Sequence, residues 1–259
     1  MPQADRNQQT LLRCLAFAVL VLTLAVGAAT VTWAAEAKVS KEKLSSGGRD
    51  RTYYLFVPES VASATPAPLI LLLHGSGRNG YSLVEKWKDI AAREGIIIAG
   101  PDAVDSAAWR TPVDGPQFLR ELVNTLSAKH PIDARRVYLF GHSAGAEFAL
   151  RMALLESEYF AAATIHAGAL MPDEYSLIEY ATRKVPINVC IGTRDPIFPL
   201  PLVRATVTAL NAKGFTTRLA EVPGHDHNYY IRSPAINRDA WDFLKVQKLD
   251  KEPKFTEYR

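Results

Sequence analysis

The pentapeptide GHSAG at positions 141–145 is the feature that most restricts the fold of this chain. A β-rich apolar run over 136–141 leads into it, and a helical pattern over 143–156 follows, with Phe148 and Met152 on one side. Glycines on either side of Ser143 would let strand and helix approach closely, while the tight turn holds the serine in a strained conformation. The hydroxyl would then lie at the positive end of a helix dipole, which favours developing negative charge. The motif therefore predicts a nucleophilic serine between a strand and a helix.

Short β-rich runs and helix-length segments alternate along most of the chain. The β-rich runs cover 51–57, 68–74, 95–100, 136–141, 161–168, 187–192 and 216–222. The helix-length segments cover 81–93, 116–129, 143–156, 200–213 and 234–247. This alternation predicts a mainly parallel central sheet with helices on both faces.

The beginning of the folded region has a different pattern. Residues 38–57 read as two strands around Gly47-Gly48, which predicts an antiparallel hairpin at the edge of the sheet. A strand, a G-x-S-x-G turn and a helix on such a sheet are typical of the α/β-hydrolase fold. The connection between the strands ending at 168 and beginning at 187 is short, so no large lid domain is expected.

The N-terminal residues have the pattern of a targeting segment. Arg6 and Arg13 precede an uncharged apolar run over 15–31, and small residues around Ala35 and Ala37 follow as a cleavage site. Thr32-Trp33-Ala34 is a second candidate for cleavage. An uncleaved membrane anchor is the alternative, because the apolar run nearly reaches the length of about 20 residues that a membrane helix needs. We predict a signal peptide or anchor over 1–37 and one catalytic domain over 38–259, secreted or periplasmic and without stable membrane insertion after cleavage.

Composition excludes several classes of function. The 259 residues include 30 basic and 27 acidic side chains, with a net charge of +3, and no basic block stands out. Nucleic acid is therefore not an expected partner. Cys14 lies within the targeting segment and Cys190 is alone in the mature chain, so no intramolecular disulfide is expected. Cys190 fits a small buried residue on a strand.

A serine nucleophile needs a base and an acid that orients the base, in the chain order serine, acid, histidine. Asp195 follows the strand over 187–192, at the edge of the sheet where catalytic groups gather. Asp173 and Glu174 are rivals in the preceding connection, but they follow no clear strand. An Asx turn before Pro196 is the structural alternative for Asp195.

Two histidines compete for the role of the base after the last strand. His227 lies four residues after Pro223, and Gly224 permits the bend, whereas His225 is the second choice. The pair could instead bind a metal as H-x-H, but no cluster of carboxylates and histidines elsewhere completes a coordination set. We favour His227 and expect neither a metal nor an organic cofactor.

The loop after the strand over 68–74, with glycines at 75, 77 and 80, matches the G-x-G-x-x-G spacing of a dinucleotide-binding turn. The acidic residue that such a site needs is not cleanly placed, since Asp102 comes too late and after a proline. In the α/β-hydrolase fold this loop instead supplies one donor of the oxyanion hole. We predict the N–H groups of Ala144 and of Ser76, or alternatively of Gly77, as the donors.

Aromatic and cationic residues in two loops are candidates for binding substrate. Trp109 and Arg110 follow the strand over 95–100 and could form a cleft wall, although a packed tryptophan is equally consistent with the sequence. Phe198, Tyr229 and Tyr230 could supply further aromatic surface.

The chain also resembles a known group of proteins over most of its length, from about 51 to 244. The stretches RTYYLFVPES, LLLHGSGRNG, PIDARRVYLFGHSAG, IGTRDPIFP and PGHDHNYY are similar to those of secreted esterases of the polyhydroxybutyrate depolymerase and feruloyl and acetylxylan esterase group. The resemblance implies Ser143 as nucleophile, Asp195 as acid and His227 as base. It implies acyl esters linked to polysaccharides or polymers as substrates. A secreted peptidase of the same fold and a non-catalytic binding module are the alternatives.

Overall fold

The computed structural model describes residues 38–61 and 65–256. The predicted targeting segment over 1–37 lies outside the described residues, and both its cleavage and the secreted location stay predictions. Within the described ranges, no helix has the length and apolar character needed to cross a bilayer.

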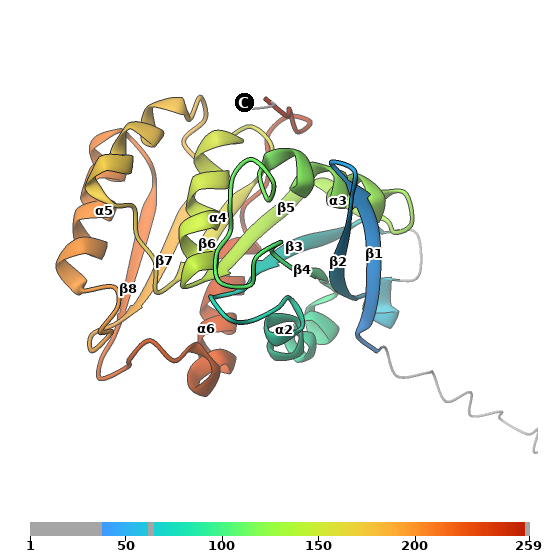
Figure 1. Cartoon of the computed structure of the whole chain (residues 1–259), viewed down its shortest axis with the longest axis horizontal. Helices are drawn as coiled ribbons and strands as arrows, with labels where there is room; N and C mark the ends of the chain where they lie inside the picture. The colour runs from blue at the N-terminus through green and yellow to red at the C-terminus, as the bar shows by residue number, and fades with distance from the viewer. Residues whose placement is uncertain (1–37, 62–64, 257–259) are drawn as a thin grey trace, which may run out of the picture. The chain divides into compact units, whose positions relative to one another are not determined.

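The described residues form an eight-stranded sheet in the order β1-β2-β4-β3-β5-β6-β7-β8 (Figure 1). The strands are β1 Ser40–Ser46, β2 Arg49–Phe56, β3 Ala67–Leu73, β4 Ile97–Pro101, β5 Ile132–His142, β6 Ala162–His166, β7 Ile187–Gly192 and β8 Thr217–Val222. Strand β2 pairs antiparallel with both β1 and β4, and every other neighbouring pair is parallel. The predicted parallel sheet with an antiparallel N-terminal hairpin is confirmed.

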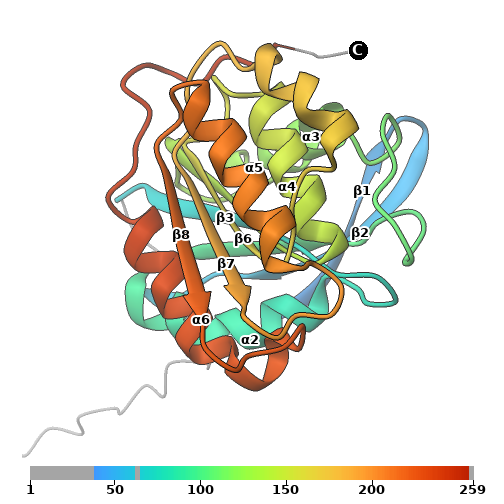
Figure 2. The ribbon, with the colours of Figure 1, turned by 90° about the vertical axis from the view of Figure 1, so that its left-hand side faces the viewer.

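Five α-helices cover the two faces of this sheet (Figure 2). They are α2 Tyr81–Glu94, α3 Pro116–Ser127, α4 Ala144–Leu155, α5 Leu200–Ala212 and α6 Tyr229–Leu244, and the short 3-10 helices η1 Glu59–Val61 and η2 Pro172–Tyr180 complete the described elements. The connection from β6 to β7 contains only η2, and no lid domain lies there.

The start of α6 differs from the prediction, which placed it at residue 234. The helix begins at Tyr229, and Pro234 lies inside it. Proline has no N–H to donate to the carbonyl four residues earlier, that of Tyr230. The Ser233 hydroxyl donates to that carbonyl instead, at 3.3 Å. A side chain thus replaces the missing backbone bond, and the helix continues through the proline.

Alternation along the central strands divides the core between the two faces. In β3, Leu69, Leu71 and Leu73 are buried in the cluster that contains α3, α4 and α5, whereas Ile70 and Leu72 pack with α2 and α6. All five side chains are fully buried. A strand covered on both faces needs apolar residues at every position, which explains the uninterrupted run in the sequence. Because the sheet is packed on both faces, the carboxyl ends of its strands are held in position, and the loops of the site start from these ends.

Candidate active site

Ser143 forms a strained turn between β5 and α4. It has φ 57° and ψ −124°, a positive φ that is rare for a residue with a side chain. A Cβ atom at Gly141 would lie 2.1 Å from the Gly145 carbonyl oxygen, and one at Gly145 would lie 2.0 Å from the Leu73 carbonyl oxygen. Only glycine therefore fits at these two positions, for the reason that the sequence pattern predicts. The turn presents the serine at the end of α4 where free N–H groups gather.

Three side chains predicted from the sequence lie in one hydrogen-bonded row. His227 Nε2 is 2.8 Å from Ser143 Oγ, and His227 Nδ1 is 2.8 Å from Asp195 Oδ2. The second carboxylate oxygen of Asp195, Oδ1, accepts the N–H groups of Ile197 and Phe198 at 2.8 and 2.9 Å. The Asp195 side chain is fully buried, while His227 is 20% exposed. The imidazole thus has a fixed carboxylate behind it and a hydroxyl in front of it.

Two loops at the carboxyl edge of the sheet bring the acid and the histidine together. Asp195 lies in the loop after β7, and His227 lies in the loop between β8 and α6. A Cβ atom at Gly192 would lie 2.2 Å from the His225 carbonyl oxygen, so the two loops are in backbone contact. The N–H of Arg194 donates to the same oxygen at 2.9 Å. These contacts fix the separation of the two catalytic candidates.

The alternative candidates for the acid and the base lie outside the row formed by Ser143, His227 and Asp195. Glu174 belongs to η2 and forms an ion pair with Arg151 at 2.6 Å, and Asp173 is its neighbour in that short helix. His225 is buried and bonds through Nε2 to His166 Nε2 at 3.1 Å, so this nitrogen is already engaged. The geometry favours Asp195 and His227 over these three residues.

The glycine-rich loop after β3 lies against the serine. A Cβ atom at Gly75 would lie 3.2 Å from Ser143 Cβ. The Gly77 N–H is already used, since it donates to the Ser106 carbonyl at 2.8 Å. Among the described residues no acceptor takes the Ser76 N–H, and Ala144 occupies the first position of α4, where N–H groups have no helical partner. Of the two alternatives in this loop, the contacts favour Ser76 as the oxyanion donor.

The structure favours the packed alternative for Trp109, and neither Trp109 nor Arg110 lines the pocket around Ser143, so neither is placed to bind substrate there. Trp109 is buried, stacks on Phe148 at 4.8 Å and donates Nε1–H to the His74 carbonyl at 2.8 Å. Arg110 points outward and pairs with Asp105 at 3.0 Å. The indole therefore supports the strand end before the glycine loop.

The predicted aromatic residues take different roles. Phe198 is buried, and its ring stacks against His227 with 6.0 Å between centroids, so it contacts the imidazole and does not line the pocket. Tyr229 is fully buried, whereas Tyr230 does line the pocket. Only Tyr230 is thus placed to form the aromatic surface that the sequence suggested.

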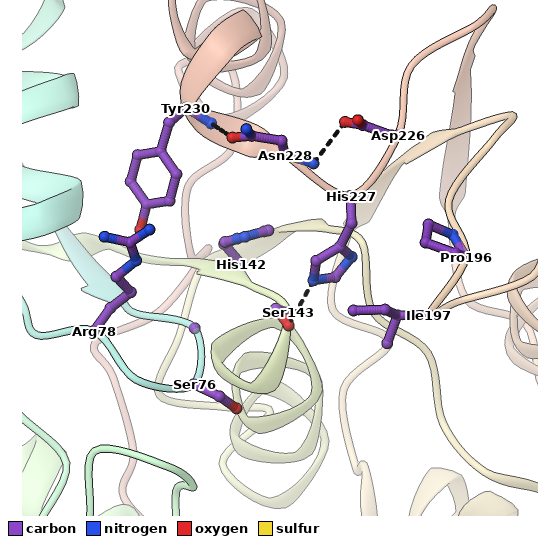
Figure 3. Close-up of a pocket in the computed structure, with 11 residues that line it drawn as sticks. Ser76, Arg78, His142, Ser143, Pro196, Ile197, Asp226, His227, Asn228 and Tyr230 are labelled. Atoms are coloured by element: carbon purple, nitrogen blue, oxygen red, sulfur yellow. Dashed lines mark hydrogen bonds between the residues drawn. The ribbon is translucent and has the colours of Figure 1, made fainter.

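A pocket of about 510 Å³ opens at Ser143 (Figure 3). It is lined by Gly75, Ser76, Arg78, His142, Ser143, Pro196, Ile197, Asp226, His227, Asn228 and Tyr230. Sequence reasoning missed Arg78, Ile197, Asp226 and Asn228 as lining residues. Their positions next to predicted site residues in the chain are the signal that could have found them.

Three histidines outside the row form a second chain of hydrogen bonds. His142 and His166 are paired across β5 and β6, with their Nδ1 atoms 3.0 Å apart, and His166 Nε2 is 3.1 Å from His225 Nε2. Burial lowers the pKa of His142 to about 4 and that of His166 to about 2, and it also lowers the pKa of His225. Neutral rings can link in this way because each donates through one nitrogen and accepts through the other.

The buried histidines predict a loss of stability in acid. The unfolded chain takes up a proton at each ring near pH 6.5, whereas the folded chain keeps the rings neutral to lower pH. The contribution of these rings to the free energy of unfolding is therefore fully present above about pH 6.5 and is lost as the pH falls toward 4. Urea unfolding between pH 4.5 and 7.5 should show this decline. His166→Asn should reduce the slope by up to about 1.4 kcal/mol per pH unit. An unchanged slope would contradict the neutral histidine chain.

No group of three or more His, Cys, Asp or Glu side chains in the described part of the chain is arranged to hold a metal ion. The two histidines of the H-x-H pair have different partners: His225 bonds to His166, and His227 bonds to Ser143 and Asp195.

Comparisons with known proteins agree with this fold. Residues 116–238 match the Phospholipase/Carboxylesterase family. NocK of Nocardia uniformis subsp. tsuyamanensis, whose name describes an esterase, is 28% identical over 178 residues, which are 64% of this chain and 51% of NocK. The bifunctional acetylxylan esterase/xylanase XynS20E of Neocallimastix patriciarum is 26% identical over 154 residues, which are 58% of this chain and 22% of XynS20E.

The solved structure of LpqC, a poly(3-hydroxybutyrate) depolymerase from Bordetella parapertussis, superposes with a TM-score of 0.64 at 19% identity, over 80% of this chain and 91% of LpqC. At that identity the likeness shows the fold. The chain therefore has the α/β-hydrolase fold, as predicted, and its sequence matches are to esterases. The chain spans about half the length of NocK and about a fifth of XynS20E.

Proposed function

We propose that the protein is a carboxylic ester hydrolase that works through an acyl-enzyme on Ser143. The observation that carries the proposal is the row of two 2.8 Å hydrogen bonds from Ser143 through His227 to Asp195. A hydroxyl hydrogen-bonded to an imidazole that is oriented by a buried carboxylate is the arrangement that activates a serine for acyl transfer.

In the first half of the reaction, His227 Nε2 takes the proton of Ser143 while Oγ attacks the ester carbonyl carbon. The carbonyl electron pair moves to the oxygen, and the N–H groups of Ser76 and Ala144 stabilise the resulting oxyanion. When the carbonyl reforms, the bond to the alcohol oxygen breaks, and His227 gives its proton to that oxygen. Asp195 stabilises the imidazolium that exists between these steps.

In the second half, His227 takes a proton from water as the water oxygen attacks the acyl carbon. The bond to Ser143 Oγ then breaks, and the proton returns to Oγ. The products are the carboxylic acid and the free serine. Each half begins and ends with a neutral imidazole, so the cycle needs no other acid or base.

Acyl groups carried by polysaccharides or polyesters are the substrates that we favour. The connection from β6 to β7 contains only the short helix η2, and none of its residues lines the pocket around Ser143, so we expect a long chain to reach the serine. The names of XynS20E and LpqC describe activities on such polymers. A targeting segment over 1–37, as the sequence predicts, would bring the domain to polymers outside the cytoplasm.

A panel of substrates tests this proposal. We expect hydrolysis of short aryl esters, release of acid from acetylated xylan or poly(3-hydroxybutyrate), and little cleavage of peptide anilides. Ser143→Ala protein is the control for each rate. Cleavage of anilides in preference to esters would favour a peptidase, and binding without turnover by folded protein would favour a non-catalytic module.

A further inference from the structure

The two sides of the pocket differ in chemistry. Arg78 and Tyr230 lie on one side of Ser143, and Pro196 and Ile197 lie on the other, with His227 between (Figure 3). An ester bound at the serine extends in both directions from its carbonyl carbon. One of its halves therefore meets a cation and an aromatic ring, and the other meets apolar side chains.

Arg78 lies on an exposed stretch of the glycine-rich loop, and its guanidinium packs against an aromatic ring. Its backbone N–H donates to the Gly75 carbonyl at 3.2 Å, and its guanidinium carbon lies 5.0 Å from the centre of the Tyr230 ring. The Tyr230 hydroxyl donates to Ser82 Oγ at 3.2 Å, which anchors that ring to α2. Stacking occupies one face of a guanidinium and leaves its N–H edge available.

The Arg78 guanidinium has no acidic partner in the part of the chain that the structure describes. Among the described residues Arg78 forms no ion pair, whereas Arg110, Arg151 and Arg204 each have an acidic partner. Asp226 is the acidic residue in the pocket lining, and it lies beyond His227 on the far side from Arg78, where Oδ1 accepts the Asn228 N–H at 2.8 Å (Figure 3). The positive charge of Arg78 thus faces the space that substrate would occupy.

We propose that Arg78 is a specificity-determining residue that binds a carboxylate on the substrate, so that esters bearing a carboxylate near the scissile bond are preferred. The inference rests on the proposed ester hydrolase function. A guanidinium matches the planar carboxylate with paired N–H donors, and a charge-assisted hydrogen bond is stronger than a neutral one. The carboxylate belongs to the half of the ester that lies toward Tyr230.

Two pairs of esters test the inference, each pair differing only in carboxylate against carboxamide. Monoethyl glutarate and its amide place the charge on the acyl half, and 3-acetoxybenzoate and its amide place it on the alcohol half. In one of these two pairs, the native protein should hydrolyse the carboxylate ester with a kcat/KM about tenfold higher than that of the matching carboxamide. Arg78→Ala should remove most of that preference, chiefly through KM, and Arg78→Lys should keep part of it.

Arg232→Ala is the matched control, because Arg232 is an exposed cation on α6 that does not line the pocket. It should keep the preference, and an equal loss in both alanine variants would overturn a direct contact by Arg78. Neutral esters cleaved by Ser143 with no carboxylate preference would overturn the inference and leave the proposed function standing. No hydrolysis of any ester by folded protein would reject both.

Discussion

Ser143→Ala is expected to lower kcat for ester hydrolysis by about a millionfold, since removing the serine of a triad costs about that much. The variant has no oxygen to form the acyl-enzyme. His227 remains bonded to Asp195 but has no hydroxyl to deprotonate. Initial rates with a short aryl ester, measured at high protein concentration, would determine the residual activity.

The same change should leave the fold intact. The hydrogen bond from Ser143 Oγ is the one to His227, and alanine has the same Cβ in the strained turn. The midpoint of thermal unfolding should therefore stay within a few degrees of the native value. A folded variant with near-native activity would contradict the assignment of Ser143 as nucleophile.

Asp195→Asn is expected to lower kcat by about 10⁴-fold. Asp195 Oδ1 accepts two backbone N–H groups, so the amide oxygen of asparagine should occupy that position and its NH₂ should face His227 Nδ1. An amide donor there places the imidazole proton on Nε2. The nitrogen that should accept the Ser143 proton is then already protonated, and the base is lost while the geometry is kept.

Asp173→Asn provides the comparison for this loss. Asp173 is the rival acid from the sequence, but the structure places it in η2, away from the bonded row. Its replacement should change kcat by less than about twofold, since surface changes away from such a feature have small effects. Equal losses in the two variants, measured by steady-state kinetics, would contradict the role of Asp195.

The sequence predicts the fold and the row of candidate catalytic residues because local rules determine both. Glycine spacing fixes the turn at Ser143, and the alternation of strands and helices places the ends of parallel strands along one edge. Asp195 and His227 follow two of those strands directly. Chain order therefore pointed to three distant residues, and the hydrogen bonds of the structure then favoured His227 over His225.

Features that depend on tertiary packing could not be predicted from the sequence. Trp109 lies in an irregular loop, where no periodicity shows that its ring turns inward to Phe148 and His74. The chain of three histidines depends on the register that sets His142 beside His166, and on the path of the loop after β8. These contacts join segments that no local pattern relates.

Labelling with a fluorophosphonate probe, followed by peptide mass spectrometry, tests the central claim most directly, because the probe reacts with activated serines whatever the natural substrate. The account predicts a single adduct on Ser143, absent in His227→Ala and retained in His225→Gln, since His225 bonds to His166 and not to the serine. An adduct on another residue, or none on folded protein, would contradict an activated Ser143.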